Sequence, residues 1–198
     1  MYITATRDTA APVVLAKTFD NETWHKLRFT FSEDVSASLS ASDLVVTNLA
    51  TNQPLPPGSF TFASGGTDLT TGTWTATSLL PNGNYRATLA AGSVAGSVAD
   101  RGGNALAAPV TLDFRVLAGG ANNDGVITFD DYVRIDLGFN NHLTGFRNGD
   151  FNYDGVVNFD DYVIIDIAFN QQGSRLSPGQ SGTPRRPGSP ASRPAPRS

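Results

Sequence analysis

Two nearly identical stretches lie thirty residues apart in the last part of the chain, "NNDGVITFDDYVRIDLGFN" and "NYDGVVNFDDYVIIDIAFN". Aligned over 120–141 and 150–171, the two copies are identical at thirteen of twenty-two positions. A duplication this clean indicates a tandem supersecondary unit, in which one copy packs against the other. The duplication therefore predicts that residues 117–172 form a small paired module, distinct from the residues that precede them.

The second copy has the pattern of a calcium loop. Calcium takes six to eight oxygen ligands, and such a loop supplies them from side chains at its first, third and fifth places. Glycine at the sixth place allows a sharp turn, and the seventh, ninth and twelfth places add a main-chain carbonyl, a water-bridging side chain and an acid. The predicted ligands are Asp150, Asn152, Asp154, Val156, Asn158 and Asp161, with Gly155 at the turn.

The first copy matches this pattern except at one place. Its predicted ligands are Asn122, Asp124, Val126, Thr128 and Asp131. Gly120 stands where the second copy has Asp150, so one carboxylate is missing. We therefore expect two Ca²⁺ sites, of which the second binds more tightly. The alternative is that the acids only complement the start of a helix, with Asn158 as its N-cap and Asp161 three residues later, which needs no metal. It explains Asp160 and Asp161 but not the spacing of Asp150, Asn152, Asp154 and Gly155.

Each loop runs into an apolar helical pattern, in which Tyr132, Ile135 and Phe139 share one face and Tyr162, Ile165 and Phe169 repeat it. No amphipathic helix precedes either loop. A loop followed by a helix, given twice, resembles a type I dockerin over 117–172. That resemblance implies calcium-dependent binding to a cohesin-like or other surface protein. The implied partner contacts are Phe129, Asp130, Phe159 and Asp160, followed by Asp136 and Asp166.

The Phe-Asp pairs depart from the small hydroxyl residues that many cellulosomal dockerins carry there. The alternative for Phe129 and Phe159 is packing inside the module.

Residues 8–116 follow a two-residue period instead. In "LRFTF", Leu27, Phe29 and Phe31 alternate with polar residues, and the same alternation recurs near 60–62, 74–76, 85–89 and 112–116. Glycine- and proline-rich turns separate these runs. Short alternating strands with regular turns predict an antiparallel β-sandwich. "RFTFSEDV", "NGNYRATL", "VADRGGNAL" and "TLDFRV" resemble the bacterial Ig-like domains of S-layer and cell-surface proteins. That resemblance implies a spacer, adhesion or display role.

Composition narrows the function. There is no cysteine, the only histidines are His25 and His142, and no G-x-S-x-G motif occurs, so we expect no enzyme. Residues 117–170 carry nine acids and two bases, which favours a cation over nucleic acid. No stretch is long and apolar enough for a membrane span. The alternative function is carbohydrate binding or adhesion by the sandwich, with Trp24 or Trp74 as a stacking platform.

The predicted fold is multidomain: an all-β Ig-like sandwich (8–116), a small all-α dockerin-like module (117–172), and a disordered Pro/Ser/Arg-rich tail (173–198) with five arginines. No signal peptide is visible at the start of the chain. We expect a monomeric, non-catalytic anchoring region of an exported bacterial protein, extracellular or at the cell surface. It would be the C-terminal part of a larger polysaccharide-processing or cell-surface protein.

Overall fold

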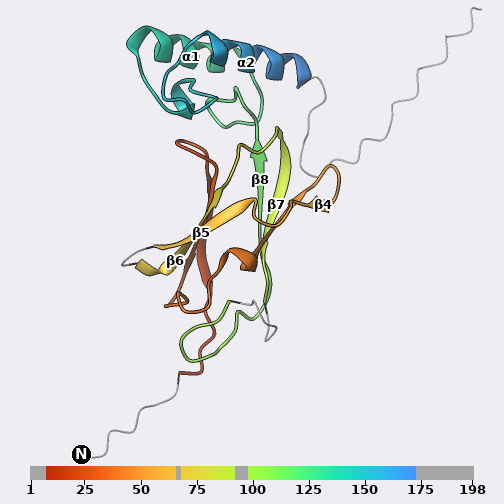
Figure 1. The fold of residues 1–198 in the computed structure, drawn as a ribbon, viewed down its shortest axis with the longest axis vertical. Coiled ribbons are helices and arrows are strands. Elements are labelled where there is room, and N and C mark those ends of the chain that lie inside the picture. The colour runs from red at the N-terminus through yellow and green to blue at the C-terminus, as the bar shows by residue number, and fades with distance from the viewer. Residues whose placement is uncertain (1–7, 66–67, 92–97, 173–198) are drawn as a thin grey trace, which may run out of the picture.

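A computed structural model describes residues 8–65, 68–91 and 98–172. It contains a β-sandwich with a pair of helices at one end (Figure 1). The predicted tail, 173–198, lies outside the described residues. The strands are β1 (Val14–Asp20), β2 (Lys26–Phe31), β3 (Leu44–Asn48), β4 (Gln53–Pro54), β5 (Phe60–Gly65), β6 (Asp68–Ala76), β7 (Gly83–Leu89) and β8 (Val110–Val116). The helices are η1 (Ala41–Asp43), α1 (Phe129–Asn141), η2 (Phe146–Asn148) and α2 (Phe159–Gln171).

The strands form two antiparallel four-stranded sheets, in the orders β1-β2-β6-β5 and β4-β3-β7-β8. The predicted alternation is confirmed: Leu27, Phe29 and Phe31 of β2 are at most 1% exposed, and β7 likewise alternates buried with partly exposed residues. Inward side chains of both sheets interdigitate into one core, as in other sandwiches. The antiparallel β-sandwich that the sequence pattern predicts is therefore confirmed by the two packed sheets.

The polar ends of the largest core aromatics have hydrogen-bond partners. The indole N–H of Trp74 donates to the carbonyl of Ser40 at 3.1 Å, and the hydroxyl of Tyr85 donates to the carbonyl of Pro81 at 2.8 Å. Both side chains are completely buried. Trp74 and Tyr85 thus bury large rings in the core while their N–H and O–H donors remain hydrogen-bonded. They are therefore well suited to fix the packing of the two sheets.

Both α-helices begin at the predicted places. Thr128 caps α1 and Asn158 caps α2, and in each case the aspartate three residues later accepts from the cap residue's main-chain N–H. This reciprocal arrangement satisfies N–H groups that the first turn of a helix leaves unpaired. The predicted capping role of Asn158 and Asp161 is thus confirmed.

The two repeats cross-pack through glycines that precede the loops. Gly119 has φ +93°, and a Cβ added there would lie 3.0 Å from Cα of Ile165 in α2. Gly149 has φ +105°, and its Cβ would lie 2.8 Å from Cα of Ile135 in α1. Ile135 and Ile165 are fully buried. Each loop entry therefore packs on the helix of the other repeat, and only glycine fits there.

Candidate metal centre and helix face

The second loop, 150–161, is a tight turn with two left-handed residues, Tyr153 (φ +61°) and Gly155 (φ +87°). The Asn152 side-chain oxygen accepts from the N–H of Asp154, and the Asp154 carboxylate accepts from the N–H of Val156, both at 2.9 Å. These bonds tighten the loop, and the amide of Asn152 also donates to the Asp154 carboxylate at 3.0 Å, so these two predicted ligands lie together.

The last predicted ligand of this loop closes it. Asp161 is fully buried, and its carboxylate accepts from the N–H groups of Phe151 (2.8 Å), Asn152 (3.3 Å) and Asn158 (3.0 Å). Burial raises the pKa of the Asp161 carboxyl, and the charge of Asp150 adds to the rise. Two carboxylates thus approach one another in a site with little water, an arrangement that a cation stabilises.

Asp150 is the ligand that distinguishes the two copies. It is 4% exposed, and its Oδ2 accepts from the N–H of Gly155 at 3.2 Å. Its Oδ1 is buried and has no hydrogen-bond partner. A buried carboxylate oxygen without a partner costs free energy, and a hard divalent cation would offset that cost. The donor set of this loop, carboxylates with amide and main-chain oxygens, fits calcium.

The first loop has the same left-handed positions and shares several of the internal bonds of the second. Asn123 and Gly125 are left-handed at φ +59° and +87°. Asp131 is fully buried and accepts from the N–H groups of Asn122 (3.2 Å) and Thr128 (2.8 Å). The side chains of Asn122 and Asp124 are bonded as Asn152 and Asp154 are. The structure therefore brings the predicted residues of both copies into equivalent loops.

Two differences make the first loop less favourable for a cation. Gly120 supplies no carboxylate. In addition, the guanidinium of Arg115, at the end of β8, donates through Nη1 to the carbonyl of Gly125. A fixed positive charge against the loop opposes a second one inside it. Sequence reasoning missed Arg115, because nothing local to the loop indicates that the preceding strand reaches it.

The helices expose an apolar face on each copy. Phe129 and Phe159 are 78% and 74% exposed, so packing inside the module covers little of either side chain, although the ring of Phe159 lies 5.6 Å from that of Phe139 in α1. Further exposed apolar residues follow at four-residue steps along each helix: Val133 and Leu137 on α1, Val163 and Ile167 on α2. Contiguous exposed apolar residues of this kind are typical of interaction surfaces.

Asp136 and Asp166 have a role inside the module. The hydroxyl of Tyr132 donates to Asp166 at 2.6 Å, and the hydroxyl of Tyr162 donates to Asp136 at 2.5 Å. Burial and then the bonded carboxylate raise the pKa of each tyrosine to about 12. The two bonds are reciprocal between α1 and α2, so these aspartates hold the helices together.

Trp74 lies in the core with no exposed surface, as its place in the two-residue alternation predicts, so it offers no stacking platform for a carbohydrate. Trp24 is half-buried, and its indole N–H donates to the carbonyl of Ala76 at 2.6 Å. Its ring lies edge-on to Tyr153 of the second loop, with centroids 5.5 Å apart. Trp24 therefore belongs to the contact between sandwich and helical module.

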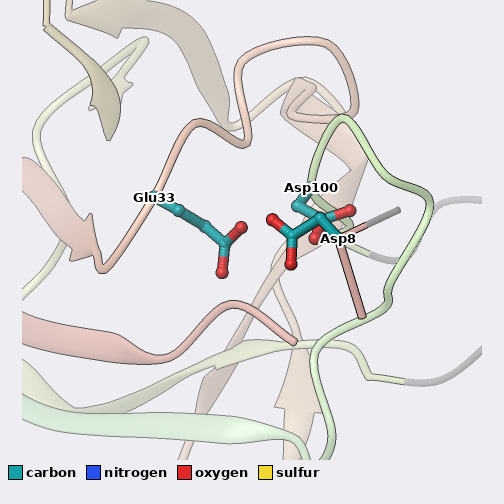
Figure 2. Close-up of side chains that lie close together, drawn as sticks. All are labelled: Asp8, Glu33 and Asp100. Carbon is teal, nitrogen blue, oxygen red and sulfur yellow. The ribbon is translucent and has the colours of Figure 1, made fainter. Parts of the chain in front are cut away.

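Sequence reasoning also missed an acidic cluster on the sandwich, Asp8, Glu33 and Asp100 (Figure 2). One oxygen from each carboxylate lies within 4.8 Å of the others, and among the described residues no other three acids meet that closely. Partial burial and the charges of Asp100 and Asp8 raise the pKa of Glu33. Asp100 is held by Asn104, whose side chain donates to it at 2.7 Å. Glu33 and Asp100 lie in "RFTFSEDV" and "VADRGGNAL", which sequence reasoning used only for the resemblance to bacterial Ig-like domains.

In the part of the chain that the structure describes, no helix is long and apolar enough to cross a bilayer. The family model described as "Bacterial Ig-like domain" matches residues 6–116. No dockerin family model supports the assignment of the helical module. Comparison with curated proteins gives no match.

Proposed function

Because the chain belongs to the bacterial Ig-like domain family, whose members serve as surface or adhesion modules, we propose that it is a non-catalytic anchoring region with a calcium-dependent docking module at 117–172. The observation that carries the proposal is the buried, unpartnered Oδ1 of Asp150 inside a loop that occurs twice with equivalent geometry. Asp150, Asn152, Asp154, Asn158 and Asp161, with the main-chain carbonyl of Val156, would hold the ion in the second loop. The equivalent residues from Asn122 to Asp131 would hold it more weakly in the first.

Calcium would supply charge compensation and loop rigidity. At millimolar Ca²⁺ and a micromolar dissociation constant, binding adds about 4 kcal/mol of stability per site. The module has only a small core of its own, so a contribution of this size decides whether it is folded. Chelation is therefore expected to unfold 117–172 and leave the sandwich folded.

Calorimetric titration of the full chain with Ca²⁺, followed by circular dichroism with excess EDTA, tests this. We expect two unequal sites and a loss of helical signal on chelation, with the strand signal retained. Asp130→Asn and Asp160→Asn are the control variants, because each removes one negative charge beside a loop without removing a predicted ligand. Both should bind calcium as the unaltered chain does. Helical signal that is indifferent to EDTA would contradict the proposal.

We place the docking surface on the exposed stripes of α1 and α2. Support comes from the exposure of Phe129 and Phe159 and from the near-twofold repeat, which presents a similar stripe on each helix. The proposed partner is a cohesin-like or other cell-surface protein, outside the cell, with the chain as a monomer. Phe129→Ser combined with Phe159→Ser should abolish partner binding and leave both calcium affinities unchanged. Partner binding that persists in this variant would move the surface elsewhere.

A further inference from the structure

One residue of the sandwich contacts both loops of the helical module. Asn21 follows β1 in the β1–β2 turn, the red hairpin that points toward the helices in Figure 1, and is 8% exposed. Its side chain forms a reciprocal amide pair with Asn123, with N···O distances of 3.0 and 3.2 Å. Its main-chain carbonyl accepts from the hydroxyl of Tyr153 at 2.6 Å.

Asn123 and Tyr153 occupy the same place in their loops, the fourth. Each lies between two predicted ligands, and each is left-handed, at φ +59° and +61°. Residues other than glycine adopt this conformation at a cost, and the surrounding structure must hold them in it. The bonds to Asn21 are contacts of this kind, one for each loop. The conformation that brings the neighbouring ligands together is therefore supported from the sandwich.

The rest of the contact fixes Asn21 against the module. The ring of Tyr153 lies 5.7 Å from that of His25 and stacks on Phe146 at 5.9 Å. The carbonyl of Glu22 accepts from the N–H of Phe146 at 3.0 Å, and its carboxylate lies 3.4 Å from Arg147. The β1–β2 turn thus holds both loops and the segment that joins the repeats.

We propose that Asn21 is a positioning residue for both calcium loops, so that binding of calcium in the loops is coupled to the attachment of the module to the sandwich. This inference rests on the proposed calcium binding. A contact that favours the binding-competent loop raises its affinity for the ion, and by linkage the bound ion strengthens that contact by the same factor. The Ig-like sandwich then acts as part of the metal site as well as a spacer.

The test is calorimetric titration of full-length variants. Asn21→Ala removes both amide bonds to Asn123 and should weaken calcium binding in the first loop about tenfold, since two hydrogen bonds are lost. Asn21→Asp keeps one acceptor and should lose less. Tyr153→Phe removes only the bond to the Asn21 carbonyl and should weaken the second loop about threefold to tenfold. Asn170→Ala is the matched control, because its amide bonds only within α2.

A double-mutant cycle separates positioning from general destabilisation. Asn21→Ala and Asn123→Ala should be strongly non-additive in calcium affinity, since each removes the same pair. Protection of the β1–β2 turn from proteolysis should rise with calcium in the unaltered chain and less in Asn21→Ala. Additive effects, or affinities in Asn21→Ala within twofold of the unaltered chain, would overturn the inference alone. Absence of calcium binding by the unaltered chain would overturn the proposed function and the inference together.

Discussion

Gly138 in α1 tests how the two repeats pack, because its counterpart in α2 is Ala168. A Cβ added to Gly138 would lie 1.8 Å from the main-chain oxygen of Asn148 and 2.9 Å from its carbonyl carbon. Asn148 ends η2, the short helix between the repeats, so the close neighbour is backbone and has no rotamer to change. Gly138→Ala must therefore displace the whole segment from α1.

Two effects of opposite sign decide the outcome. Replacing glycine by alanine inside a helix stabilises it by about 1 kcal/mol on propensity alone. Relief of the overlap requires η2 to move by more than an ångström, and overpacking of a fitted interface costs about 1–3 kcal/mol, sometimes more. The displaced segment leads into Gly149 and the second loop, so further contacts are lost. We expect a net destabilisation of about 1–2 kcal/mol.

The assay is thermal unfolding of the full chain at saturating calcium, followed by helical circular dichroism. For a domain of this size, 1 kcal/mol shifts Tm by about 4–8 °C, so a fall of several degrees is expected. Asn140→Ala is the control, because Asn140 is exposed on the same helix. This variant changes the helix propensity without a steric overlap and should leave Tm unchanged or raise it. A Tm of Gly138→Ala at or above that of the unaltered chain would refute the packing described for η2.

Two further predictions concern the loops and their contact with the sandwich. Asp150→Gly should weaken calcium binding in the second loop at least tenfold, while Gly120→Asp should strengthen the first; calorimetry that finds the affinity of the altered loop unchanged in either variant would contradict this. His25 is 3% exposed, and burial lowers its pKa to about 4, while its Nδ1 accepts from the N–H of Leu80 at 3.1 Å. The unfolded chain binds a proton near pH 6.5, so stability is full above that pH and falls by about 3 kcal/mol as pH drops toward 4. His25→Gln should flatten the pH dependence of chemical denaturation between these values, and an equal slope in both proteins would exclude the effect.

The clearest strands predicted from the sequence have one buried face, although β3, which also alternates, was not among them. β2 and β7 alternate because side chains on a strand point to opposite sides, and only one side meets the core. β1 does not alternate, since four consecutive residues, Leu15 to Thr18, are exposed at the edge of its sheet. An edge strand with little burial carries no periodic signal, which is why sequence reasoning did not identify it.

The loop-helix units were predictable because their constraints are local. Ligand spacing, the turn glycine and the capping pair all fall within twelve residues, and the duplication gave each pattern twice. The contacts of Asn21 with Asn123 and Tyr153 join residues more than a hundred positions apart. They depend on how two folded parts meet, which no periodicity records. The contact of Arg115 with Gly125 was not predicted for the same reason, because it depends on how the end of β8 meets the first loop.

The cross-packing of the loop entries sets an order of assembly in time. Gly119 needs Ile165 and Gly149 needs Ile135, so the first loop cannot be completed until α2 has been delivered. During synthesis from the N-terminus, the sandwich can fold once β8 has been made. That point comes some fifty residues before Ile165 of α2. The first repeat then stays incompletely packed until the second repeat has been made. A single repeat would lack the helix against which its own glycine packs, so each copy depends on the other for its close packing.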